Sequence, residues 1–342
     1  MNILAFESSC DETAAAVVKD GRTVLSSVLS SSADMHAIYG GVVPEIASRQ
    51  HVEAIAGLAD EALRQAGISR QDIDAVAVTY APGLIGALLV GVSFAKSVAY
   101  GLGVPLIPVH HVRGHIAANY IAHPDLEPPF LCLCVSGGTT ALVDVQDYTH
   151  FRVMGGTRDD AAGECFDKTA RVLGLGYPGG GPMDKMAQGG DDQAFRFPIG
   201  HVADHPLDMS FSGLKTAVLN TIHNARQKGE ELDLHDLAAS FAAAVSDSLV
   251  PRVMEADRML GYHKIATAGG VAANSRIRAD LARACERVGT RLWMPPLSLC
   301  GDNAAMIGCQ AYYEYLRGAR AGSELNAWAN MEISEVPFYG HA

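Results

Sequence analysis

Two histidines spaced four residues apart are the most chemically suggestive feature of the sequence. They lie in the segment 110–115 (HHVRGH), and on a helix the imidazoles of His111 and His115 would share one face, as two ligands of one metal ion must. A third ligand would come from elsewhere in the chain, and Asp302, at the expected start of a helix, is the acidic candidate. Structural histidines can have the same spacing, so spacing alone leaves both interpretations open.

Three glycine-rich turns form a second group of candidates. They are the segments 135–140 (VSGGTT), 179–182 (GGGP) and 268–275 (AGGVAANS). Backbone amides freed by glycine at a strand end or a helix N-terminus suit phosphate or carboxylate groups. One such turn is weak evidence, whereas three in one chain favour a nucleotide site over plain tight turns. None is a Walker A motif, because no GK[ST] follows.

Acidic residues lie near these turns and in the first expected hairpin. Asp167 and Asp184 could accept hydrogen bonds from both hydroxyls of a ribose. Asp11 and Glu12 are adjacent, which is costly unless they face a cation, amide donors or water, and a solvated turn is an equally good interpretation. Lys215 and the arginine-rich segment 275–291 could contact phosphate, although solvated side chains are the simpler interpretation.

The elements that must position these residues indicate an α/β chain with a largely parallel sheet. Two similar runs of three strands, each followed by helices, predict a pair of related lobes. The segment 177–207 is rich in Gly, Asp and Pro and is expected to be a long loop. The expected strands are 2–7, 13–19, 23–31, 74–79, 106–109, 129–135, 139–145, 151–154, 264–268 and 291–294. The expected helices are 45–66, 86–102, 159–173, 234–260, 275–288 and 302–317.

Length, charge and cysteine use narrow the functional classes. The chain has 342 residues, of which 49% are hydrophobic and 19% charged, which is enough for two lobes with buried cores. Its formal net charge of −12 argues against a stand-alone nucleic-acid binder. Seven cysteines without a CxxC pair, and an N-terminus unlike a signal peptide, predict a cytoplasmic protein. The apolar segment 81–109 is too interrupted by glycines for a membrane span, so no membrane association is expected.

Taken in order along the chain, the motifs resemble the tRNA threonylcarbamoyladenosine transferases of the TsaD type, formerly called the O-sialoglycoprotein endopeptidase or glycoprotease family. The resemblance covers about residues 3 to 315. The segments that carry it are 7–13 (ESSCDET), 39–45 (YGGVVPE), 81–84 (APGL), the His111/His115 pair, 135–138 (VSGG), 159–164 (DDAAGE), 166–168 (FDK), 210–216 (SFSGLKT), 269–274 (GGVAAN) and 302–306 (DNAAM).

The resemblance implies a fold and an activity. The fold would be the two-lobed architecture of actin, Hsp70 and sugar kinases (ASKHA), with RNase H-like lobes and a nucleotide cleft between them. We expect an N-terminal lobe over residues 1–128 and a C-terminal lobe over 129–342, with the final helix, about 302–318, able to pack back onto the N-terminal lobe. The activity would be transfer of a threonylcarbamoyl group from threonylcarbamoyl-AMP to N6 of adenosine 37, in the anticodon loop of tRNAs reading codons that begin with A.

The family also implies ligands, partners and site residues. One divalent metal ion, Fe²⁺ in preference to Zn²⁺, would be bound by His111, His115 and Asp302. Asp11 and Glu12 are the candidate catalytic residues. Accessory proteins are expected, of the TsaB and TsaE types if the chain is bacterial. The adenylate site would comprise Cys134, Val135, Ser136, Gly137, Gly138, Asp167, Gly180 and Asn274, with Asp184 as a neighbour.

Two residues depart from the family pattern. Arg113 stands where an acidic residue is expected between the histidines, and would raise the local charge towards a substrate carboxylate or RNA phosphate. Thr139 replaces the usual His or Asn after Ser-Gly-Gly, which removes the side-chain contact expected there.

Three alternative functions remain: two other enzyme classes and a non-catalytic nucleotide-binding scaffold. A small-molecule kinase of the same superfamily would share the cleft but would not need a two-histidine metal site. A metallopeptidase is disfavoured, because Val112 occupies the position where the HExxH motif carries its general-base Glu. Production of modified tRNA, rather than a phosphorylated small molecule or a cleaved peptide, would separate these classes.

Overall fold

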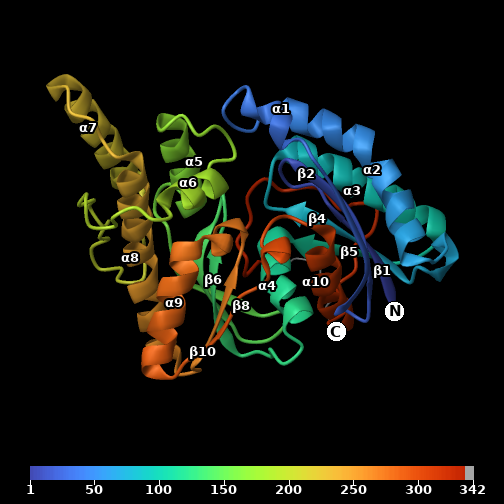
Figure 1. Cartoon of the computed structure of the whole chain (residues 1–342). Coiled ribbons are helices and arrows are strands. Elements are labelled where there is room, and N and C mark those ends of the chain that lie inside the picture. Colours follow the sequence, from blue (N-terminus) through green and yellow to red (C-terminus); the bar gives the residue numbers. More distant parts are fainter. Residues whose placement is uncertain (336–342) are drawn as a thin grey trace. The chain divides into compact units, whose positions relative to one another are not determined.

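The computed structural model describes residues 1–335, which form two compact units, each built around a five-stranded sheet (Figure 1). Unit 1 comprises Met1–Pro128, Gln146–Arg152 and the described chain from Pro295 onward. Unit 2 comprises Pro129–Val145 and Val153–Met294. The sequence placed all of 129–342 in a second lobe, with only a final helix able to pack back. Instead, a short internal segment and the whole described chain after Met294 group with unit 1.

The sheet of unit 1 has the strand order β3-β2-β1-β4-β5. The first three strands form an antiparallel meander, and β4 and β5 extend it in parallel. The hairpin between β2 and β3 turns at Asp20 and Gly21, whose φ angles of 51° and 76° are both positive, a conformation that Asp and Gly adopt more readily than most residues. The strands are β1 (Asn2–Glu7), β2 (Glu12–Lys19), β3 (Thr23–Ser31), β4 (Ala75–Ala81) and β5 (Leu106–His110).

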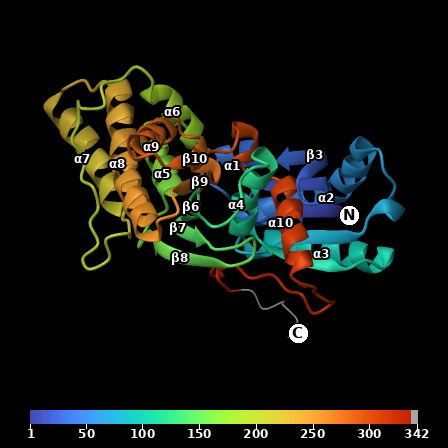
Figure 2. The ribbon, with the colours of Figure 1, turned by 90° about the horizontal axis from the view of Figure 1, so that it is seen from below.

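Helices pack on both faces of this sheet, because β1 is apolar on both. Leu4 and Phe6 pack in one core with α2 and α3, whereas Ile3 and Ala5 pack in another with α4 and α10. Helix α10 lies beside α4 (Figures 1 and 2). The helices are α1 (Ala33–Ala37), α2 (Pro44–Ala66), α3 (Ile85–Leu102), α4 (His111–Ala122) and α10 (Ala304–Leu316), with short 3₁₀ turns at Arg70–Asp72 and Leu297–Leu299.

The chain after α10 is an integral part of unit 1. Ala321 forms an isolated antiparallel bridge with Leu106 of β5. Leu325, which is 1% exposed, joins the core that contains Leu4 and Phe6. The motifs that carry the family resemblance end at residue 306, so the packing of this segment could not be anticipated from them.

Unit 2 repeats the topology of unit 1. Its strand order is β10-β9-β6-β7-β8, and read from the opposite edge this is the same meander followed by two parallel strands. The predicted internal repeat is therefore confirmed at the level of topology. The strands are β6 (Phe130–Val135), β7 (Thr140–Val145), β8 (Phe151–Gly156), β9 (Lys264–Ala268) and β10 (Arg291–Trp293).

The helices of unit 2 surround a single apolar core that includes Phe166, Phe211 and Phe241. The segment 177–207 is not wholly a loop as predicted, because α6 forms within it. The helices are α5 (Ala162–Val172), α6 (Gly180–Ala187), α7 (Ser212–Lys228), α8 (Leu234–Leu260) and α9 (Ser275–Val288), with a 3₁₀ turn at Gly270–Ala273.

Two of the described helices, α3 and α8, are long and apolar enough to cross a membrane by composition alone. A core helix of a globular unit meets the same criterion, and α8 is mostly buried among the residues of unit 2. Helix α3 packs one face against β4 and the same core as Leu4 and Phe6.

Candidate metal centre and nucleotide-binding cavity

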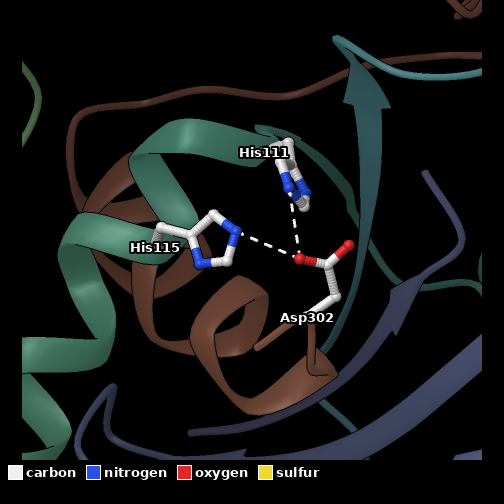
Figure 3. A group of neighbouring side chains, drawn as sticks. All are labelled: His111, His115 and Asp302. Carbon is white, nitrogen blue, oxygen red and sulfur yellow. Dashed lines mark ion pairs between the residues drawn. The ribbon is translucent and has the colours of Figure 1, made fainter. Parts of the chain in front are cut away.

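The structure brings His111, His115 and Asp302 together within unit 1. Both imidazole rings point toward the Asp302 carboxylate (Figure 3). Asp302 Oδ1 lies 3.5 Å from His111 Nε2 and 3.1 Å from His115 Nε2. One potential ligand atom from each residue lies within 4.8 Å of the others, which is close enough for all three to bind one ion.

Local structure explains this convergence. Helix α4 begins at His111 directly after β5, so the two histidines occupy its first two turns. Asp302 immediately precedes Asn303, whose side-chain oxygen accepts a hydrogen bond from Met306 N and caps α10. A Cβ atom at Gly114 would lie 2.7 Å from Ile307 Cδ1, so the glycine permits the close approach of α4 to α10.

The donor set fits a divalent transition metal. Two imidazoles and one carboxylate suit zinc or iron and leave a position for substrate or water. The Nδ1 atom of His115 is buried and has no hydrogen-bond partner among residues 1–335, whereas its Nε2 makes the 3.1 Å contact with Asp302 Oδ1. A metal ion would take the lone pair of whichever ring nitrogen is not protonated.

Strong electrostatic coupling links the three residues. Burial alone would lower the pKa of His111, but the carboxylates of Asp302 and Glu7 outweigh it and raise that pKa to about 9. Burial alone would raise the pKa of Asp302, but His111 and His115 outweigh it and lower that pKa to about 2. The metal-free site thus favours a protonated His111 beside an ionised Asp302 over the pair of neutral side chains.

Glu7, at the end of β1, belongs to this cluster although its role was not recognised in the sequence. Its Oε2 lies 3.0 Å from His111 Nδ1 and accepts a 2.5 Å hydrogen bond from Thr79 Oγ1. Its Oε1 accepts from Ser9 N at 2.5 Å. The only indication in the sequence is that this acidic residue ends an otherwise mostly apolar strand.

The turn that carries Asp11 and Glu12 is held by backbone-directed hydrogen bonds. The Asp11 carbonyl accepts from Ser32 N at 2.9 Å and from Ser32 Oγ at 2.8 Å. The Cys10 carbonyl lies 2.9 Å from Nε2 of the buried His51. Burial, together with the carboxylates of Asp302 and Asp11, raises the pKa of Glu12 to about 9. The turn is therefore fixed in place and electrostatically coupled to Asp302.

Arg113 does not face a substrate, and this corrects the sequence-based expectation. The residue is 1% exposed, and its Nη1 lies 3.0 Å from Glu314 Oε1. Its Nε and Nη2 donate to the Ile333 carbonyl at 2.9 and 2.6 Å, and its guanidinium lies over the Phe151 ring. On a helix, a residue two positions from each histidine points away from their shared face. Arg113 therefore joins α4 to α10 and to the C-terminal segment.

Unit 2 contains a cavity of about 290 Å³ among the glycine-rich turns. Five of the predicted adenylate residues line it, namely Gly137, Asp167, Gly180, Asp184 and Asn274. The lining also includes Gly163, Phe166, Pro178, Gly181, Gly270, Val271 and Ala273.

The other four predicted adenylate residues do not line this cavity. Cys134 and Val135 lie within β6 and are buried between its neighbours β7 and β9, because strand pairing continues to Val135. Ser136 and Gly138 form the following turn, in which the Ser136 hydroxyl accepts from Thr139 N. Thr139 thus contributes a backbone contact to the turn.

The two cavity aspartates also organise the turns around them. Asp167 Oδ1 accepts from Gly179 N at 2.7 Å, and Asp184 Oδ1 accepts from both N and Oγ of Ser275. A Cβ atom at Gly163 would lie 2.5 Å from the Ser136 carbonyl oxygen, so only glycine allows α5 to approach this turn. Packed glycines and carboxylates together shape the cavity wall.

Two arginines in the basic segment of α9 form ion pairs. Arg276 forms ion pairs with Asp192 and Asp280, and Arg283 also pairs with Asp280. This agrees with the simpler interpretation of a solvated, salt-bridged helix face.

Comparisons with known proteins identify a family. Residues 23–309 match the model of the TsaD family, described as tRNA N6-adenosine threonylcarbamoyltransferase. The chain is 52% identical over 335 residues to the protein of that name from Clostridium botulinum strain 657, covering 98% of both chains. It is 54% identical over 333 residues to the one from Clostridium perfringens strain ATCC 13124, covering 97% of this chain and 98% of that protein.

A solved structure of HypF from T. kodakarensis has a TM-score of 0.64 at 16% identity, covering 93% of this chain and 48% of that one. At that identity the likeness shows the fold alone, which is of the α/β ASKHA class. The kinase and metallopeptidase alternatives find no support in the family match or in the curated relatives. The chain therefore belongs to the TsaD family of tRNA N6-adenosine threonylcarbamoyltransferases.

Proposed function

We propose that this transferase uses threonylcarbamoyl-AMP as its donor and modifies N6 of adenosine 37 in tRNAs that read codons beginning with A, releasing AMP. The single observation that carries the site assignment is the convergence of His111, His115 and Asp302, from two segments nearly 200 residues apart, in a chain of this family. The buried imidazole of His115, whose Nε2 lies 3.1 Å from the Asp302 carboxylate, supports metal binding there.

In this proposal each unit has a distinct task. The cavity of unit 2 binds the adenylate, with Gly137, Asp167, Gly180, Asp184 and Asn274 around it. In unit 1, His111, His115 and Asp302 hold one divalent ion, Fe²⁺ in preference to Zn²⁺. When bound, such an ion supplies Lewis-acid polarisation of a carbonyl oxygen.

In the transfer step, the exocyclic amine of adenosine attacks the carbamoyl carbon, the bond from that carbon to the phosphate oxygen breaks, and AMP leaves. The proton lost by the amine goes to a protein carboxylate. We assign this role to Asp11 or Glu12, whose turn is held in place by the contacts of its backbone with Ser32 and His51. The hydrogen bonds that hold the turn of Asp11 and Glu12 in place would contribute to the rate by positioning the proton acceptor.

Partners and location follow from the same proposal. The net charge of −12 disfavours avid, unaided tRNA binding, so accessory proteins of the TsaB and TsaE types would supply part of the tRNA-binding surface. A tRNA-modifying enzyme with seven free cysteines would work in the reducing cytoplasm.

The experiment supplies synthetic threonylcarbamoyl-AMP, unmodified tRNA and partner proteins, and then digests the tRNA for nucleoside mass spectrometry. We expect threonylcarbamoyladenosine to form together with an equal amount of AMP. A tRNA that stays unmodified, under conditions in which one of the Clostridium relatives modifies it, would contradict the proposal. ATP turnover with a phosphorylated small molecule as product would instead indicate a kinase.

A further inference from the structure

We propose that Glu7 is the positioning residue of the metal centre. It would fix the tautomer and orientation of His111, so that Nε2 is presented to the ion. This inference rests on the metal centre proposed above and deepens it. It concerns how the centre is built and not which group is transferred, so it can be tested by metal binding without the transfer reaction.

The surroundings of Glu7 prevent its carboxylate from contacting a substrate. The side chain is fully buried, and both oxygens are engaged by hydrogen bonds from β4, from the β1–β2 turn and from α4. A carboxylate enclosed by donors from three segments cannot reach a substrate. Glu7 therefore acts through His111 and is not itself a catalytic residue.

The contact with His111 determines which ring nitrogen carries the proton. A carboxylate accepts hydrogen bonds and cannot donate them, so the nitrogen 3.0 Å from Glu7 Oε2 must be Nδ1–H. Ser9 Oγ, 3.1 Å from the same nitrogen, serves as a second acceptor. The neutral ring then has its lone pair on Nε2, the atom that faces Asp302.

His115 lacks such support, which makes the centre asymmetric. Its Nδ1 is buried without a hydrogen-bond partner within the described part of the chain, so no acceptor selects its tautomer. The rings of His111 and His115 contact each other edge to face, with centroids 4.6 Å apart. A firmly oriented His111 consequently also limits where the His115 ring can lie.

The hydrogen bonds around Glu7 predict what its replacement would do. In Glu7→Gln the amide oxygen can replace only one carboxylate oxygen. If it faces His111 and Thr79, the amide NH₂ meets the backbone N–H of Ser9, so two donors face each other. Reversing the amide sets its NH₂ against His111 Nδ1–H. Either arrangement weakens the orientation of His111, and loss of an outer-shell partner typically costs 10- to 100-fold in metal affinity.

The experiment measures affinity for Zn²⁺ and Co²⁺ by competition with a chelator, for the full chain and for Glu7→Gln. Asp144→Asn is the matched control, because Asp144 is equally buried but lies in unit 2. We expect a 10- to 100-fold weaker affinity for Glu7→Gln and wild-type affinity for Asp144→Asn. Thr79→Val, which removes one donor to Glu7 and keeps its charge, should give a smaller loss in the same direction.

A second measurement keeps the proposal testable if Glu7→Gln does not fold. Imidazole ¹⁵N NMR of the wild-type zinc form should show His111 protonated at Nδ1 and coordinated through Nε2. Coordination through Nδ1 would overturn the proposal, as would wild-type metal affinity in a folded Glu7→Gln variant. A merely structural role for Glu7 would lower stability without moving either the affinity of the folded protein or the ¹⁵N signature.

Discussion

Arg113 and Glu314 form an ion pair that joins the helix carrying two proposed metal ligands to the helix that follows the third. Arg113 Nη1 lies 3.0 Å from Glu314 Oε1, and both side chains are about 2% exposed. Gln310 Nε2 donates to the same Glu314 oxygen at 2.9 Å. The pair stabilises the approach of α4 to α10 on which the metal centre depends.

Reversing one charge of this pair should therefore be far worse than reversing both. Arg113→Glu alone places two buried carboxylates together, and we expect a loss of about 3 to 5 kcal/mol in unfolding free energy. The double variant Arg113→Glu/Glu314→Arg should recover part of it, but not the bonds to the Ile333 carbonyl. Denaturant titration of the three proteins measures the coupling. A double variant no more stable than the single one would show that the pair contributes nothing.

The C-terminal segment should contribute to the stability of unit 1 through Leu325. Replacing this buried side chain by Ala removes apolar contacts with the core, and we expect a loss of about 2 to 4 kcal/mol. Trp328→Ala is the control on the same segment, because Trp328 is 53% exposed. Thermal unfolding should distinguish the two variants, and equal midpoints would mean that the segment does not pack as described.

Metal affinity should increase with pH up to about pH 9. In the metal-free protein the pKa of His111 is raised to about 9 by Asp302 and Glu7, so at neutral pH binding must displace a proton. Affinity for Zn²⁺ should rise about 10-fold per pH unit below pH 9 and level off above it. Proton release measured by calorimetry in buffers of different ionisation enthalpy checks this. Binding that is independent of pH between 6.5 and 8.5 would contradict it.

His51 should make the protein less stable in mild acid. Burial lowers its pKa below the ordinary 6.5, so the unfolded chain binds a proton more readily than the folded one. This contribution is fully present above pH 6.5 and is lost as the pH falls below it. Unfolding free energy should drop less between pH 7.5 and pH 5 in His51→Gln than in the wild type. Identical pH dependence of the two proteins would show that folding does not lower the pKa of His51.

Gly163 should be required for nucleotide binding. In Gly163→Ala the new Cβ would lie 2.5 Å from the Ser136 carbonyl oxygen, so α5 and the turn must separate and the cavity wall must change. Gly213→Ala is the control, because its Cβ would meet nothing within 4 Å. AMP binding measured by calorimetry should weaken at least 10-fold in the first variant only. Unchanged AMP affinity in Gly163→Ala would place the nucleotide elsewhere.

The parts of the site that depend on local sequence were predictable. Helical spacing brought His111 and His115 to one face, and the family motif added Asp302. The sequence does not identify Glu7, because its partners Thr79 and His111 lie 72 and 104 residues away along the chain. The parallel pairing of β1 with β4 brings Thr79 next to Glu7, and a pairing over this distance leaves no periodic pattern in the local sequence.

The directions of two other sets of side chains also depend on the secondary structure and could not be read from the motifs. Arg113 was assigned to the substrate because it lies between two histidines in sequence, although α-helical geometry turns it toward Glu314. Cys134 and Val135 precede the glycine turn, and the pairing of β6 buries their side chains. In both segments the motif identifies a stretch of chain, whereas the secondary structure determines the direction of each side chain.

The proposed transfer is tested most directly by nucleoside mass spectrometry of tRNA incubated with partner proteins, donor labelled with ¹³C in the carbamoyl carbon, and either the wild-type chain or His115→Ala. We predict one labelled threonylcarbamoyl group at adenosine 37 with the wild type, release of AMP in equal amount, and strongly reduced product with His115→Ala. Unlabelled or unmodified adenosine 37 with the wild type, in a reaction that a Clostridium relative completes, would contradict it.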